Sequence, residues 1–258
     1  MKRIYQAIRF LILAMLLTLG SLAWGQTGVT DNSYKKWSKK DVEKVLNDSP
    51  WVSVQEVRIR KEGQAQRVAG APASLTRDET NSVASGGSDI PIDFIFTLRL
   101  RSALPIRQAL VRQKQLEAKY DSMDEKKKAA FDTSSAGLLE CPACVDNYVV
   151  TLSSRSKNSP GADAVYTTFK GARLDDIKRY MYLANEHGER RELVHFVPPR
   201  APGEEAVFFF PRLDKEANQL FRPDSKEAIV NLTNNQVSLS TNFHFDIAKL
   251  VSNGQVVF

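Results

Sequence analysis

The stretch Glu140–Ser154 reads ECPACVDNYVVTLSS and holds both cysteines of the chain, Cys141 and Cys144. It leads directly into a Val-Val-Thr segment whose β-branched and aromatic content is typical of a strand. A Cys-x-x-Cys pair can close a small disulfide ring, supply two thiolates to a zinc site, or act as a redox dithiol. No other part of the sequence gathers reactive side chains in this way, so the candidate site begins here.

The elements around the pair favour a structural disulfide or plain paired thiols. In thioredoxin-like proteins the pair opens a helix, whose N-terminal dipole stabilises the attacking thiolate. Here Cys144 precedes a strand instead, and the acidic neighbours Glu140 and Asp146 would raise a thiol pKa. Export, which residues 1–25 indicate, would also place the pair where disulfides persist. A redox dithiol and a zinc site are the alternatives.

A zinc site would need two more ligands besides Cys141 and Cys144, and the chain has only three histidines, His187, His195 and His244. Their spacing fits none of the usual patterns of two cysteines followed by two histidines. His195 is the remaining candidate partner of the cysteines. His244 alternates with two phenylalanines, so we expect it to face solvent. We therefore expect neither a bound metal nor a cofactor.

Residues 1–25 have the pattern of an export signal. Basic residues precede the apolar run Phe10–Leu19, and small residues at the usual offsets predict cleavage between Gly25 and Gln26. The run is short for a membrane span, which needs about 20 apolar residues. We expect a periplasmic or extracellular protein with no span after cleavage, and a retained N-terminal anchor is the alternative.

The composition is that of a globular protein held together by its core. Apolar residues make up 42% of the 258 positions, whereas two cysteines cannot form a disulfide scaffold. The formal charge of +6 includes three basic residues of the signal, so the mature chain carries 6 − 3 = +3. A net positive charge this small gives no reason to expect nucleic acid as a partner.

Beyond the signal, we expect a flexible lead-in at 26–36 and a single α+β domain at 37–258, with a disordered or mobile loop at about 63–89. The fold class we predict is α+β, a mostly antiparallel sheet with helices packed on one side. Ser38 and Asp41 form a capping-box pattern at the start of a short amphipathic helix. The other expected helices are Ser102–Met123, Asp124–Phe131 and Leu174–Asn185, and the expected strands are Val52–Arg60, Ile90–Leu100, Tyr148–Ser153, Glu192–Val197, Ala206–Pro211, Ala228–Leu232 and Val237–Ile247.

Three phrases of the sequence resemble those of an uncharacterised family of exported acidobacterial proteins. They are WSKKDVEKVLNDSPW at Trp37–Trp51, SALPIRQAL at Ser102–Leu110, and CPAC at Cys141–Cys144 before YVVTL. The resemblance implies export and a shared fold. It implies no activity, cofactor or catalytic residue.

The common enzyme motifs are missing from the sequence, including the Gly-x-Ser-x-Gly elbow, His-Glu-x-x-His, the phosphate-binding glycine loop and the dinucleotide fingerprint. We therefore expect a non-catalytic interaction or scaffold protein of the cell envelope or periplasm, whose partner is an unidentified protein or envelope component. The rival is a thiol-disulfide redox or zinc-dependent function at Cys141 and Cys144. A hydrolase whose site carries no sequence motif is a third hypothesis.

Cleavage of the signal gives the first testable prediction. Intact-mass analysis of the protein recovered from the cell envelope should show a chain that begins at Gln26. A chain that keeps residues 1–25 and fractionates with membranes would instead support the N-terminal anchor.

Overall fold

The computed structural model describes residues 32–59, 91–222, 224–234, 239–252 and 255–256. The export signal with its Gly25–Gln26 cleavage site, and the loop expected at 63–89, lie outside the described residues. Asn32–Lys36, at the end of the expected lead-in, form the 3-10 helix η1, in which Tyr34 is buried.

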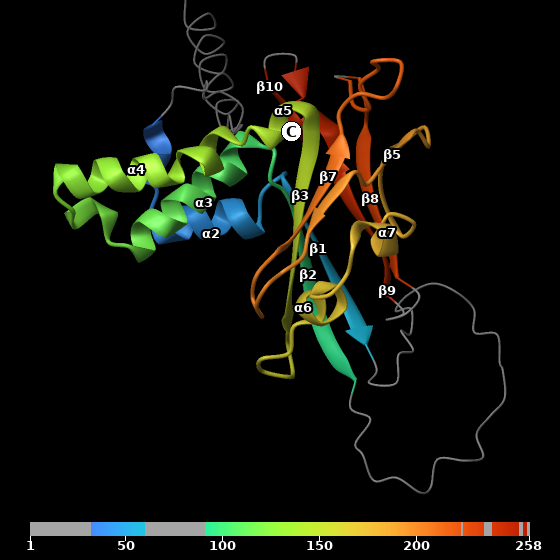
Figure 1. Ribbon diagram of the computed structural model, residues 1–258, viewed down its shortest axis with the longest axis horizontal. Helices are drawn as coiled ribbons and strands as arrows, with labels where there is room; N and C mark the ends of the chain where they lie inside the picture. Colours follow the sequence, from blue (N-terminus) through green and yellow to red (C-terminus); the bar gives the residue numbers. More distant parts are fainter. Residues whose placement is uncertain (1–31, 60–90, 223, 235–238, 253–254, 257–258) are drawn as a thin grey trace, which may run out of the picture. The chain divides into compact units, whose positions relative to one another are not determined.

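A five-stranded antiparallel sheet has β3 at its centre (Figure 1). In β3, the consecutive residues Tyr148–Leu152 are all buried, so both faces of the strand are covered. The two strands that flank the 63–89 segment pair with each other, with Val52 opposite Arg99 and Ile59 opposite Ile92. In spatial order the strands are β1 (Val52–Ile59), β2 (Ile92–Leu100), β3 (Asn147–Ser156), β7 (Ala206–Pro211) and β6 (His195–Val197).

A second antiparallel sheet has four strands, and a short strand pair follows it near the end of the chain. Together with the helices, these antiparallel sheets make the fold α+β, as the sequence predicts. The strands of the second sheet, in spatial order, are β5 (Arg190–Glu192), β4 (Met181–Asn185), β8 (Glu227–Asn234) and β9 (Leu239–Asp246). The short pair is β10 (Val251–Ser252) with β11 (Gln255–Val256).

One continuous hydrophobic core draws on both sheets. Phe208 of β7 is fully buried there, and its ring centroid lies 5.6 Å from that of Phe169 and 5.1 Å from that of Phe196. Alternation explains this arrangement, because Ala206, Phe208 and Phe210 point into the core while the intervening residues of β7 are half-buried. The same core includes Phe96, Leu98, Leu152, Met181, Leu183, Val230 and Phe243.

Three helices lie together on one side of the five-stranded sheet (Figure 1). They are α2 (Lys39–Asn47), α3 (Leu104–Glu117) and α4 (Glu125–Glu140). The capping box at the start of α2 is confirmed, since Asp41 N–H donates to Ser38 Oγ and Ser38 N–H donates to the Asp41 carboxylate. The shorter helices are η2 (Tyr120–Ser122), α5 (Ala143–Asp146), α6 (Ala164–Phe169), α7 (Leu174–Ile177) and η3 (Ile247–Leu250).

The helix predicted at Leu174–Asn185 is wrong. Helix α7 ends at Ile177, and Met181–Asn185 form β4 between β5 and β8. Apolar residues in so short a run fit a helical face and a strand face equally well, and pairing on both edges selects the strand. Pairing with different sheets also divides the strand expected at Glu192–Val197 into β5 and β6.

Phe208 offers a test of the core, with its neighbour Phe209 as a matched control. Phe208→Ala should lower the free energy of unfolding by about 3–5 kcal/mol, because a fully buried aromatic ring leaves a cavity. Phe209→Ala should cost less than half as much, since Phe209 lies on the half-buried face of the same strand. Urea denaturation followed by circular dichroism measures both, and equal losses would contradict the assignment of the two faces.

Candidate functional site

Cys141 and Cys144 lie at the junction between α4 and β3. Cys141 caps the C-terminus of α4 with a left-handed backbone, φ 47°, and its N–H donates to the carbonyl of Gly137. Cys144 belongs to α5, and its N–H donates to the carbonyl of Cys141 at 2.8 Å. The two sulfur atoms are at disulfide distance, as the sequence predicts, and the Cα atoms are 5.3 Å apart. The bridge therefore closes a small ring between the end of α4 and α5, just before the central strand begins.

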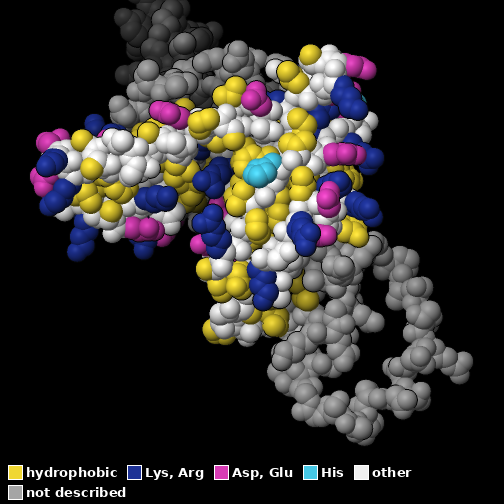
Figure 2. Space-filling view, viewed as in Figure 1, with side chains coloured by type: hydrophobic (Ala, Val, Ile, Leu, Met, Phe, Trp, Pro, Cys, Tyr) yellow, Lys and Arg dark blue, Asp and Glu magenta, His cyan; other side chains and the backbone are white. Residues whose placement is uncertain are grey.

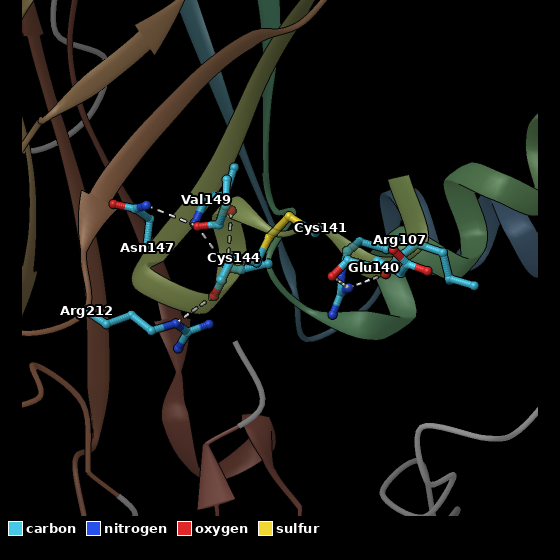
Figure 3. The surroundings of a disulfide bond; sticks show 10 residues. Arg107, Glu140, Cys141, Cys144, Asn147, Val149 and Arg212 are labelled. Atoms are coloured by element: carbon cyan, nitrogen blue, oxygen red, sulfur yellow. Dashed lines mark hydrogen bonds between the residues drawn. A yellow bond between two sulfur atoms is a disulfide. The ribbon is translucent and has the colours of Figure 1, made fainter. Parts of the chain in front are cut away.

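Two arginines flank this disulfide, and neither is near it in sequence. Nη1 of Arg107, from α3, donates to the carbonyl oxygens of Leu139 and Glu140, the latter at 3.0 Å. Nε of Arg212, which follows β7, donates to the carbonyl oxygen of Cys144 at 2.9 Å. Figure 3 shows Arg107 on the Cys141 side of the bridge and Arg212 on the Cys144 side. Both ends of the Cys-x-x-Cys segment are thus tied to a cation through the main chain.

Two half-buried cations lie beside the main chain of the disulfide segment. Burial lowers the pKa of Arg107 and of Arg212, and the proximity of Arg212 lowers that of Arg107 further. Both guanidinium groups nevertheless stay protonated at any physiological pH. Glu140 and Asp146, from which the sequence suggested a raised thiol pKa, are exposed, so water and salt screen their charges more strongly. The half-buried arginines are screened less, and both bond the main chain beside the cysteines.

Exposed apolar side chains adjoin the same site. Val145, directly after Cys144, is 72% exposed, and Leu213, directly after Arg212, is 47% exposed. The N–H of Arg212 donates to the carbonyl of Asp146, which brings the two segments together. Figure 2 shows apolar side chains gathered over β3 and β7 on the face that it draws. Val145 and Leu213 thus leave apolar side chains exposed on both segments beside the disulfide.

Each of the three histidines has a neighbour other than the cysteines. His195 packs on Phe209 in the β6–β7 pairing, with ring centroids 4.8 Å apart. His244 is half-exposed, as expected, and its Nδ1 lies 2.7 Å from Oε1 of Glu227. His187 is exposed and lies beside Glu186. Among the described residues, no group of three or more His, Cys, Asp or Glu side chains is arranged to hold a metal ion.

A groove of about 610 Å³ lies between α2, α3 and the five-stranded sheet. Apolar side chains of the two helices form one part of its lining, and polar groups around Arg99 form the other. The lining includes Lys39, Val42, Glu43, Leu46, Asn47, Arg99, Leu110, Gln113, Leu116, Glu117, Ser153 and Glu205.

Arg99 joins three parts of the fold at one end of the groove. Its Nε donates to the carbonyl of Leu46 at 2.7 Å, and Nη2 donates to Oδ1 of Asn47 at 3.1 Å. Its Nη1 donates to Oγ of Ser153 at 3.1 Å and to Oε1 of Glu205 at 2.7 Å. The guanidinium thus connects the end of α2 to β3 and to the loop before β7. A cation is favourable there because it meets the carbonyl end of a helix dipole.

Sequence reasoning found the cysteines but missed all three arginines. Arg99 alternates with apolar residues in β2 and therefore resembles any solvent-facing strand residue, while Arg107 belongs to what reads as a basic helix face. The antiparallel pairing of β3 with β2 and β7 brings Arg99 to the groove and Arg212 to the disulfide, and the packing of α3 on α4 brings Arg107 there.

No protein-family model, curated protein or solved structure matches this chain. Within the described ranges, none of the helices has the length and apolarity that crossing a membrane requires. The functional argument therefore depends on the groove and the disulfide.

The connecting role of Arg99 can be tested by its loss. Arg99→Met should lower the free energy of unfolding by about 3 kcal/mol, because the partly buried Glu205 carboxylate and the Leu46 carbonyl lose their donor. Arg155→Met, an exposed change on the same sheet, should stay within about 0.5 kcal/mol of the wild type. Chemical denaturation compares the two, and a loss for Arg99→Met no larger than that of the control would contradict this role.

Proposed function

We propose that this chain is an exported protein of the periplasm or cell envelope that acts by interaction, without catalysis of its own in the groove. Its partner is a peptide segment of another exported protein, held between α2, α3 and the five-stranded sheet. The observation that carries the proposal is the groove itself, in which apolar side chains and a fixed arginine face the same space. The export pattern of residues 1–25 and the resemblance to exported acidobacterial proteins support the location.

The apolar part of the groove suits a hydrophobic anchor residue. Val42 and Leu46 of α2 are buried, and Leu110 and Leu116 of α3 are half-buried at the groove lining. Binding that covers Leu110 and Leu116 would remove their remaining apolar surface from water. Each Å² buried in this way contributes about 25 cal/mol to the binding free energy. Interfaces generally derive most of their affinity from a few such anchors.

The polar part of the groove favours a peptide over a lipid chain. Lys39 and Glu43 stand on the rim as an exposed pair 3.8 Å apart, and Glu117 lies on the same lining. An acyl chain would cover these charges without pairing them, which costs free energy. A peptide brings amide groups and side chains of both signs, so it complements a rim that carries both charges.

Arg99 provides a specific contact for the peptide main chain. Four of its five N–H groups have partners among the described residues. The fifth, on Nη2, can donate to a carbonyl oxygen of the bound segment. Because the other four bonds fix the guanidinium, little side-chain entropy is lost on binding.

Site-specific photo-crosslinking tests the proposal in the producing cell. A photoreactive residue at Gln113, on the groove rim, should crosslink to a defined segment of one exported protein, whereas the same residue at Gln219 should not. Both replaced glutamines are exposed, so the two variants differ chiefly in position. Mass spectrometry of the crosslinked peptide identifies the segment.

A synthetic peptide of that segment then gives the quantitative test. Its affinity, measured by fluorescence anisotropy, should fall about tenfold or more for Leu116→Asp, which removes an anchor contact. Gln113→Arg, an exposed change that fills the rim without touching the core, should weaken binding in the same direction. Equal crosslinking at both positions, or unchanged affinity in both variants, would overturn the proposal, and crosslinks to lipid alone would assign the groove to an acyl chain.

A further inference from the structure

The two sulfur atoms of the disulfide belong to residues of different accessibility. Cys144 is 7% exposed, whereas Cys141 is only half-buried at the end of α4. Thiol–disulfide exchange requires an incoming thiolate to reach one sulfur atom while the other leaves. The accessible member is Cys141, so Cys144 is the leaving group. Its environment then decides how readily the disulfide opens.

The arginines favour a thiolate at this position. Arg212 is bonded to the main chain of Cys144, and Arg107 lies on the other side of the bridge (Figure 3). A cation near a cysteine stabilises the thiolate, and a leaving thiolate of low pKa departs faster. The carbonyl end of α4 has the opposite effect on Cys141. Arg107 offsets it, because its donors bind the carbonyls of Leu139 and Glu140 at that helix end.

We propose that the Cys141–Cys144 disulfide is an oxidant for cysteine pairs of other exported polypeptides, with Arg107 and Arg212 as its positioning residues. The exposed Val145 and Leu213 beside it contact the apolar side chains of an incompletely folded client. This activity goes beyond the groove function, since the groove lining and the disulfide share no residue.

The exchange proceeds in two steps that balance. A client thiolate attacks Sγ of Cys141, a mixed disulfide forms, the Cys141–Cys144 bond breaks, and Cys144 leaves as a thiolate. The second client thiolate then attacks the client sulfur of the mixed disulfide and releases Cys141. The client dithiol has lost two electrons and two protons, and the Cys141–Cys144 pair has gained two electrons and is reprotonated from solvent.

Equilibration with glutathione measures the effect of the arginines on the full mature chain. Arg212→Gln and Arg107→Gln should each lower the equilibrium constant for reduction of the disulfide about tenfold, because the thiolate loses a nearby cation. Tenfold corresponds to about 30 mV for this two-electron couple. Arg212→Lys should restore most of the loss, since it keeps the charge. Arg155→Gln, an exposed change near the far end of β3, is the matched control and should behave as the wild type.

A separate trapping experiment shows which of the two sulfur atoms the client thiolate attacks. With a synthetic peptide that carries a pair of cysteines, Cys144→Ser should trap a mixed disulfide at Cys141, and Cys141→Ser should trap several-fold less. Circular dichroism establishes that each variant is folded before the comparison. Equal trapping by the two variants, or arginine variants that match Arg155→Gln, would overturn the oxidant role and leave the bridge as a structural staple. Neither result bears on peptide binding in the groove, which is measured separately.

Discussion

The burial of β3 on both faces is the constraint on which the rest of the structure depends. On one face, Tyr148 packs against Phe221 with ring centroids 5.1 Å apart, within the core shared with the second sheet. On the other, Val149 is buried near Ser102, which precedes α3 and bonds its main chain. In this chain the second sheet covers one face of β3, and the helical side of the molecule covers the other. The two coverings together give the α+β arrangement.

The local sequence pattern is enough to predict helices and strands that depend on short-range interactions or that have a clear capping or alternation pattern. The capping box at Ser38 and the alternation of β2 are examples, because both depend on short-range chemistry. Met181–Asn185 were assigned to a helix because their strand character depends on β5 and β8 at both edges. The cysteine pair was visible in the sequence, whereas its arginines come from α3 and from the end of β7, which only tertiary pairing brings together.

Arginines bonded to main-chain carbonyls recur at the ends of the helices. Arg99 binds a carbonyl of the last turn of α2, Arg107 binds the end of α4, and Arg112 binds the carbonyl of Trp37 just before α2. Carbonyls at helix ends lack intrahelical donors, and a planar guanidinium reaches them from a neighbouring element. Arg99 thus attaches α2 to the sheet by a directional polar bond as well as by apolar packing. Arg107 and Arg112 join α3 to α4 and to the segment before α2.

The step from β5 to β6 has a mechanical consequence. Only Leu193 and Val194 separate the two strands, yet β5 pairs within one sheet and β6 within the other. Leu193 is buried, and the N–H of Val194 donates to the carbonyl of Phe209. Both residues of this short linker are therefore held in place. The two sheets are therefore coupled through a short covalent link as well as through the core, and neither can move away from the other without displacing Leu193 and Val194.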